Sequence, residues 1–125
     1  MMKKNILLVD DDEALCNLLA EIISESGFNY DLASNGKIAF DLYVKNKYDL
    51  IVTDMKMPVM DGRELIETIR SDKKDKPIPI LITSAYIGVN EVKDLLDIGA
   101  TYFLNKPFDK NDIIEYVNKG LGLNG

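Results

Sequence analysis

The chain has 125 residues and a formal net charge of −6, with 46% hydrophobic and 29% charged residues, which suits one compact domain with an ordinary core. The acidic balance argues against general affinity for nucleic acid or anionic membranes. The apolar run near the start, residues 6–9, is too short for a signal peptide or a membrane span. We therefore expect a monomeric cytoplasmic protein.

Two residue types narrow the chemistry further. Histidine is absent, which removes the commonest zinc ligand and the commonest general base. The single cysteine, Cys16, cannot form an intrachain disulfide, in keeping with a reducing compartment. Oxygen atoms are therefore the natural ligands for any metal that this chain binds.

Short apolar runs alternate with helical patterns along the chain. The runs at 6–9, 50–53 and 80–83 are nearly continuous, as in strands that are covered on both faces. Two weaker runs, at 30–33 and 100–104, predict further strands of the same sheet.

Apolar residues at helical spacing predict a helix after each strand. Gly27 and Gly99 are placed to end the first and fourth helices, Ser34 or Asn35 to open the second, and Asp109 to cap the fifth. The residues that mark the five helices are Leu15, Leu18, Leu19 and Ile22; Ala39, Leu42 and Tyr43; Leu65, Ile66 and Ile69; Val92, Leu95 and Leu96; and Ile113, Tyr116 and Val117.

This fivefold alternation predicts a doubly wound α/β fold, with a five-stranded parallel sheet and helices on both faces. No run of proline, glycine or serine suggests an interdomain linker. We expect residues 1–125 to form a single domain, with no output domain in this chain.

Chemically active residues follow four of the strands. Asp10 and Asp11 follow the first, Asp54 the third, Ser84 the fourth and Lys106 the fifth. In an open α/β sheet, ligands bind beyond the carboxyl ends of the strands, so these side chains should converge. Crowded carboxylates repel one another, and a hard divalent cation relieves that conflict. The set predicts a site for Mg²⁺, or for Mn²⁺, in which a carboxylate nucleophile receives a phosphoryl group.

Each of these residues also has a purely structural interpretation. Asp12, which follows the acidic pair, could simply cap the next helix. Asp54 could be a turn residue and Ser84 a cap or turn residue, while Lys106 could be a solvated surface charge. The functional interpretation depends on their joint placement at successive strand ends.

At this point the motifs resemble those of the receiver domain of two-component response regulators, over essentially the whole chain. The matching segments are Val9–Asp11, Thr53–Pro58 with Met60–Gly62, Thr83–Tyr86 and Lys106–Phe108. The likeness extends to stand-alone receivers such as the sporulation phosphorelay intermediate. It implies a flavodoxin-like (βα)₅ fold and a signalling receiver rather than an enzyme, which promotes its own phosphorylation and dephosphorylation, switches conformation and acts on an unknown downstream target.

The resemblance also implies roles for individual residues. Asp54 would be the phosphoacceptor, with Asp10, Asp11, Asp54 and the backbone carbonyl of Lys56 around the metal. Lys106 would pair with the phosphoryl oxygens. Ser84 would be the switch hydroxyl and Phe103 the switch aromatic, and the Lys106–Pro107 bond would be cis. The phosphodonor would be a histidine kinase or a histidine phosphotransfer protein.

Three other functions compete with this one. A hydrolase that forms an aspartyl phosphate would carry a second aspartate two residues after the nucleophile, where this chain has Lys56. A nucleotide-binding domain would need a glycine-rich turn after the first strand, where this chain is acidic. A degenerate receiver, acting only as a binding module, would lack Asp54 or Lys106.

The first helix carries more apolar residues than packing on a sheet requires. Lateral packing against a neighbouring helix would explain part of the excess. We expect the remaining edge, formed by Leu15, Leu18 and Ile22, to begin beside Asp11 and to dock the phosphodonor. Receivers that resemble this chain use the helix in that way.

Overall fold

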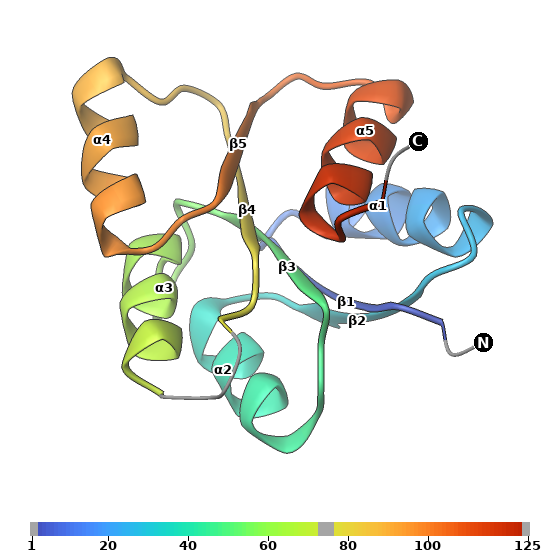
Figure 1. The fold of residues 1–125 in the computed structure, drawn as a ribbon, viewed down its shortest axis with the longest axis horizontal. Helices are drawn as coiled ribbons and strands as arrows, with labels where there is room; N and C mark the ends of the chain where they lie inside the picture. The colour runs from blue at the N-terminus through green and yellow to red at the C-terminus, as the bar shows by residue number, and fades with distance from the viewer. Residues whose placement is uncertain (1–2, 73–76, 124–125) are drawn as a thin grey trace.

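The computed structural model describes residues 3–72 and 77–123, and it alternates strands and helices in five βα units (Figure 1). The elements are β1 Asn5–Val9, α1 Glu13–Glu25, β2 Asn29–Ala33, α2 Gly36–Lys45, β3 Leu50–Asp54, α3 Gly62–Ser71, β4 Ile80–Ser84, α4 Val89–Ile98, β5 Tyr102–Asn105 and α5 Lys110–Gly120. Among these helices, none is long and apolar enough to cross a membrane.

The five strands form one parallel sheet in the order β2-β1-β3-β4-β5. Helices α1 and α5 cover one face, and α2, α3 and α4 lie on the other (Figure 1). The predicted doubly wound α/β fold is confirmed. Because the chain winds outward in opposite directions from β1, the order reverses between β1 and β3, which is where a fold of this kind leaves a crevice for ligands.

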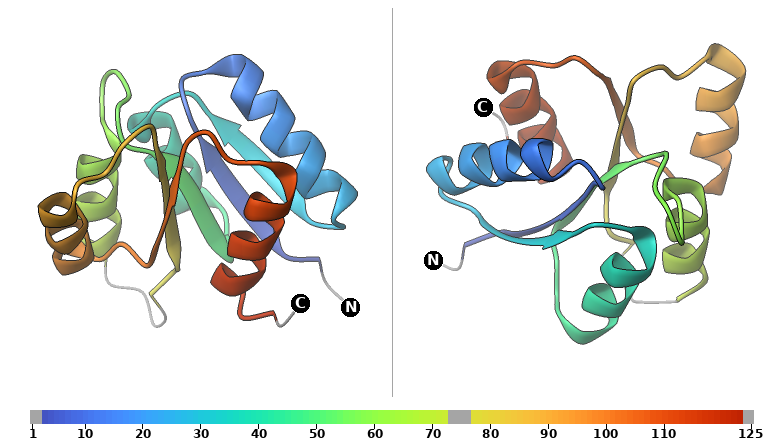
Figure 2. Two further views of the ribbon diagram at one scale, coloured as in Figure 1. Left: turned by 90° about the horizontal axis from the view of Figure 1, so that it is seen from above. Right: turned by 180° about the vertical axis from the view of Figure 1, so that it is seen from behind.

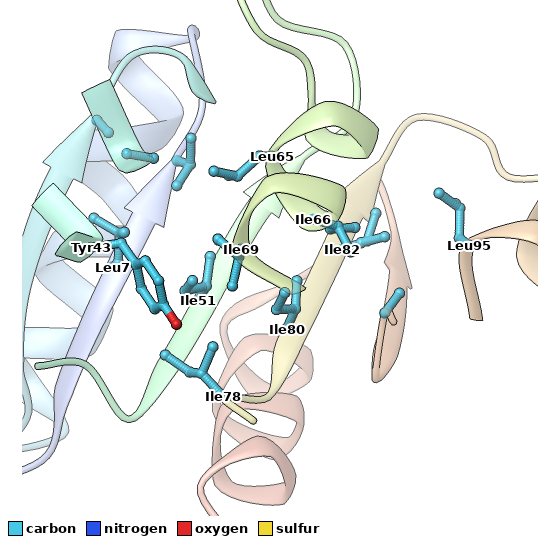
Figure 3. Close-up of a cluster of buried hydrophobic side chains, with 14 of the residues drawn as sticks. Leu7, Tyr43, Ile51, Leu65, Ile66, Ile69, Ile78, Ile80, Ile82 and Leu95 are labelled. Atoms are coloured by element: carbon cyan, nitrogen blue, oxygen red, sulfur yellow. The ribbon is translucent and has the colours of Figure 1, made fainter. Parts of the chain in front are cut away.

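Two hydrophobic cores lie on the two faces of the sheet, because successive side chains of a strand point to opposite sides. Leu7, Ile51 and Ile80 face the core beneath α2, α3 and α4 (Figure 3). Ile6 and Leu50, which precede two of them in the chain, face the core beneath α1 and α5. This arrangement explains why β1, β3 and β4 read as continuous apolar runs.

The predicted helix ends are largely confirmed. The side chain of Asn35, rather than Ser34, accepts a hydrogen bond from the backbone at the start of α2. Gly99 ends α4 with a φ of 116°, a left-handed conformation that favours glycine. Gly27 follows α1 with a φ of 89°, and Asp109 caps α5.

The fifth strand begins later than predicted. Residues 100–104 were expected to form it, but β5 runs from Tyr102 to Asn105. The Ala100 N–H donates to the Leu95 carbonyl and so completes the end of α4, while the Thr101 N–H donates to the Ile80 carbonyl. The hydrogen bonding that ends α4 therefore moves the start of β5 toward the carboxyl terminus.

The position of Ile22 differs from the prediction. Ile22 was expected on the free edge of α1, but it is buried in the core beneath α1 and α5. Leu96 lies in α4, as its spacing predicted, and is 49% exposed. Leu18 is 50% exposed, as expected for a residue on the free edge, and Leu15 is partly buried.

The loops that follow β1, β3, β4 and β5 gather along one edge of the sheet (Figure 2, left). Gly62, the first residue of α3, fixes how closely that helix approaches the end of β3. Its N–H donates to the Met55 carbonyl at 2.8 Å, and a Cβ at this position would lie 2.4 Å from the Asp54 carbonyl oxygen. No side chain can be accommodated there without moving the backbone that carries Asp54.

The substitution Gly62→Ala should therefore lower the free energy of unfolding by about 1–3 kcal/mol, the usual cost of overpacking. The control is Gly88→Ala, because a Cβ there comes no closer than 3.7 Å to the Tyr86 ring. It should cost less than about 1 kcal/mol, since alanine forfeits only the mild preference for glycine at a helix N-cap. Urea denaturation of both variants measures the difference, and equal losses would contradict the packing argument.

Candidate functional site

Three carboxylates meet at the edge of the sheet. β1 and β3 pair in register, with Val9 beside Thr53, so the next residues along each strand, Asp10 and Asp54, come side by side. Asp11 follows Asp10, and one oxygen from each of the three side chains lies within 4.8 Å of the others. The predicted convergence of these residues is present in the structure.

Lys106 reaches the same cluster from the end of β5. Its Nζ lies 3.0 Å from Asp10 Oδ2 and 3.4 Å from Asp54 Oδ1. Its backbone N–H donates to the Ser84 carbonyl, which continues the β4–β5 pairing for one residue and aims the side chain along the edge. The Lys106–Pro107 bond is cis, as predicted.

Burial strengthens the electrostatic repulsion among these carboxylates. Asp10 is 2% exposed and Asp54 is 9% exposed. The pKa of Asp54 is raised because burial removes its hydration and because Asp10 is negatively charged, although Lys106 and the Met55 N–H oppose the shift. Burial alone would lower the pKa of Lys106, but its contacts with Asp10 and Asp54 outweigh burial and raise it. Lys106 thus stays charged, as one cation facing three carboxylates.

Asp12 lies outside the cluster and has the structural role left open above. Its Oδ1 accepts a hydrogen bond from the Leu15 N–H at 3.1 Å, which caps α1. Its own N–H donates to Asp10 Oδ1 at 2.9 Å. The turn therefore orients Asp10, whose other oxygen faces Lys106.

The two predicted switch residues occupy β4 and β5. Ser84 is buried at the end of β4, and its Oγ donates to the Tyr86 carbonyl at 3.3 Å. It does not cap α4, because the N-cap residue of that helix is Gly88. Phe103 pairs in register with Ile82 and packs, partly buried, against the core beneath α2, α3 and α4.

An open hollow of about 960 Å³ extends from the carboxylates toward α4. Asp54, Lys56, Ser84 and Lys106 line it, so four of the predicted residues share one surface; the direction of the Lys56 carbonyl stays a prediction. Sequence reasoning missed other lining residues, including Arg63, Val89 and Glu91. They belong to the first turns of α3 and α4 and carry no local motif that would have singled them out.

Val59 lies in an uncommon conformation in the loop between β3 and α3. Its φ is 69°, and the Met60 N–H donates to the Pro58 carbonyl at 2.7 Å, which makes a γ-turn with Val59 at its centre. A β-branched residue rarely adopts a positive φ. The side chain is 79% exposed, so packing does not offset this strain.

The donor set fits a hard divalent cation. All three candidate side chains offer carboxylate oxygens, and the described residues bring neither imidazole nor thiolate to the cluster. Mg²⁺ prefers such oxygen ligands, commonly one or two carboxylates together with water and phosphate. Its charge would relieve the repulsion that Lys106 offsets only in part.

Near neutral pH and without divalent cations, Asp54→Asn should increase the free energy of unfolding. A carboxyl whose pKa is raised by folding is destabilising when ionised, and asparagine removes that charge while its oxygen can still accept from Met55 N–H. The gain should shrink as pH falls through the raised pKa, because the parent carboxyl then becomes neutral.

Urea denaturation at a series of pH values in the presence of a chelator measures this effect. The control is Asp12→Asn, which neutralises an exposed aspartate and preserves a good helix cap. A variant at Asp54 that is less stable than the parent, or a gain that does not depend on pH, would show that the cluster is not under electrostatic strain.

Known proteins resemble this chain along most of its length. The family model of the response regulator receiver domain matches residues 6–118. The chain is 36% identical to sporulation initiation phosphotransferase F of Bacillus subtilis over 98% of its own length and 98% of that protein. It is 35% identical to the probable transcriptional regulator ycf29 of Porphyra purpurea and 38% identical to response regulator MprA of Mycobacterium sp. (strain KMS). The chain spans about half the length of these two relatives, 56% and 48% respectively.

Solved structures agree with the sequence comparison. Chemotaxis protein CheY4 of Vibrio cholerae superposes with a TM-score of 0.91 at 26% identity, with 96% of this chain and 100% of that one covered. The receiver domain of Francisella response regulator 1452 gives a TM-score of 0.88 at 30% identity, with 96% and 98% covered. Together with the strand-end cluster, these matches show that the chain belongs to the response regulator receiver domain family of two-component signalling.

Proposed function

We propose that this chain accepts a phosphoryl group on Asp54 from a phosphohistidine of a histidine kinase or phosphotransfer protein, in a reaction that depends on Mg²⁺. The observation that carries the proposal is that Asp54 lies beside both Lys106 and the acidic pair at one edge of the sheet. In this proposal residues 1–125 act as one monomeric cytoplasmic signalling domain.

The geometry suggests which oxygen of Asp54 reacts. Oδ1 accepts from the Met55 N–H at 2.9 Å and faces Lys106, whereas Oδ2 has no hydrogen bond within the described part of the chain. Oδ2 would attack phosphorus as the phosphorus–nitrogen bond of the donor breaks, and the histidine nitrogen would leave with the electron pair. Asp54 enters this step as a carboxylate, so no general base is required.

The surrounding residues would hold the transferred group. The ammonium of Lys106 has three donors and is already held beside Asp54, so it can turn to the phosphoryl oxygens as negative charge moves onto Asp54. Asp10, Asp11, Asp54 and the Lys56 carbonyl would hold Mg²⁺, or Mn²⁺ in its place. The metal would supply charge neutralisation between the carboxylates and the phosphoryl group.

Incubation with acetyl phosphate and Mg²⁺ should add one phosphoryl group to the parent chain, and Asp54→Asn should lose at least about 99% of that labelling because the nucleophile is gone. Intact mass spectrometry and mapping of the acyl phosphate provide the measurement. Asp12→Asn is the matched control and should label like the parent. Equal labelling of the Asp54 variant would show that another residue is the acceptor.

Replacing Asp11 with alanine should weaken Mg²⁺ binding by about tenfold or more, because it removes one of three carboxylates from the cluster. Calorimetric titration of the folded variant tests this directly. The weaker binding should also reduce the thermal stabilisation that a given concentration of Mg²⁺ gives the parent. Unchanged affinity in the variant, with Asp12→Asn again as control, would exclude Asp11 from the metal site.

Phosphorylation would be transmitted through Ser84 and Phe103. Ser84 Oγ now donates to the Tyr86 carbonyl, so turning the hydroxyl toward a phosphoryl oxygen would break that bond and release the start of the β4–α4 segment. Phe103, on the neighbouring strand, could then repack against the altered segment. The face that carries α4, β5 and α5 would present this change to the downstream target.

The phosphodonor would dock on the exposed edge of α1. Leu18 is half exposed beside a hollow formed with Phe108 and Lys110 at the start of α5, and α1 begins next to Asp11. With Ile22 buried, this edge is narrower than predicted and centres on Leu18. An apolar donor helix could cover it while its phosphohistidine approaches Asp54.

Leu18→Ala should slow phosphorylation by a cognate kinase by about tenfold while leaving the acetyl phosphate rate unchanged, because only the kinase needs the docking edge. The matched control is Leu96→Ala, which removes an equally exposed leucine from α4. The kinase is one found by screening to phosphorylate the parent chain. An unchanged kinase rate would exclude α1 from docking, and loss of both rates would place Leu18 in the stabilising core.

A further inference from the structure

Helix α4 is held to the rest of the molecule more loosely than its neighbours. Leu95 is its one buried residue, whereas each of the other described helices buries two or more. Its closest packing is against α3, and in Figure 1 it stands at the margin of the fold. Val92 and Ile98 add partly buried contacts with the same core, so the contacts at the two ends of the helix influence how firmly it is held.

The carboxyl end of α4 is tied to α3 by Arg70. Arg70 Nε and an Nη donate to the Gly99 carbonyl at 3.1 and 2.8 Å. Gly99 leaves the necessary room, because a Cβ there would lie 2.7 Å from Arg70 Nε. The contact joins residues that are 29 positions apart in the sequence.

The charge of Arg70 suits the place where it lies. The carboxyl end of a helix carries partial negative charge and is stabilised by a nearby cation. The last turn of α4 has no basic residue and contains Asp97, which is unfavourable there. Arg70 supplies the missing cation from α3. Burial lowers the pKa of Arg70, with Tyr43 opposing, yet a guanidinium remains charged.

Among the described residues, the amino end of α4 has no comparable polar attachment, although Ile87, just before the N-cap, is buried in the core beneath α2, α3 and α4. Its N-cap, Gly88, makes no side-chain capping bond, and Val89 is 88% exposed. The hollow that contains Asp54 and Ser84 extends to this end of the helix. The end that lies near the reacting groups is therefore the one without a polar tie in the described part of the chain.

We propose that the Arg70–Gly99 contact is the fixed end about which α4 pivots, while the end that begins at Gly88 moves. The direction of coupling rests on the proposed phosphorylation of Asp54, which would act on the Ser84–Tyr86 segment at the moving end. The anchoring itself depends only on Arg70, Gly99 and the helix between them.

Amide hydrogen exchange of the protein without any phosphoryl analogue tests the anchor. Amides at the end of a helix usually exchange faster than those in its middle, because helix ends fray. In the parent, the α4 amides near Gly99 should be better protected than such a fraying end. Arg70→Gln removes the charge and both hydrogen bonds and should accelerate exchange at Ile98, Gly99 and Ala100 by about tenfold or more relative to α5. Arg70→Lys keeps the charge without the planar fork and should fall between the two.

The matched control is Arg63→Gln, which changes an exposed arginine on the same helix whose ion pair, among the described residues, is with Glu67. It should leave exchange around Gly99 unchanged. If the two glutamine variants exchange alike around Gly99, Arg70 is not the anchor and the proposal is wrong. Should Arg70→Gln fail to fold, the lysine variant provides the same comparison.

Amide chemical shifts measured before and after addition of beryllofluoride and Mg²⁺ test whether α4 pivots about its end at Gly99. The shifts in the parent should be largest over residues 88–92 and decline toward Gly99, and Arg70→Gln should remove this gradient. Shifts as large at Gly99 as at Val89 in the parent would overturn the pivot. If beryllofluoride changes no amide, the phosphorylation proposal fails, and the exchange comparison alone decides whether Arg70 anchors α4.

Discussion

The crowding of three carboxylates against a single lysine is the constraint on which this structure depends. Asp10 and Asp54 must lie side by side because β1 and β3 pair in register, and Lys106 must reach them because β5 ends at the same edge. The sheet thus places like charges where their mutual repulsion is incompletely offset. This repulsion supports the proposal that the site binds a cation and accepts an anionic group, which the cation and Lys106 would hold together.

The elements around this edge differ in how closely they are packed. β1, β3 and β4 are buried by helices on both faces, and Gly62 seats α3 directly on the backbone of Asp54. The α4 helix, in contrast, has one buried side chain, and in the described part of the chain its carboxyl end is tied by Arg70. In the proposed function, the closely packed part would hold the reacting groups and the adjoining, less buried helix would move. This division suits a signalling module, which must hold a reacting group still while another surface changes.

Much of the fold and most of the site could be predicted from the sequence. Strands buried on both faces leave long apolar runs, and carboxyl ends of parallel strands necessarily share one edge, so Asp10, Asp54 and Lys106 were found by position alone. Two features were not predicted, because contacts with neighbouring elements decided them. The hydrogen bonds that end α4 displaced the start of β5, and lateral packing of α1 on α5 buried Ile22. Arg70 and Gly99 are 29 residues apart and share no pattern, and a valine such as Val59 is not expected at a positive φ.

The most direct test of the account is a crystal structure of the chain with Mg²⁺ and beryllofluoride. We expect the beryllium on an Asp54 oxygen and the metal among Asp10, Asp11, Asp54 and the Lys56 carbonyl. Lys106 should turn from Asp10 toward a fluorine atom. Beryllofluoride bound at another residue, or a metal held without Asp10 and Asp11, would contradict the claim that this carboxylate cluster is the phosphorylation site.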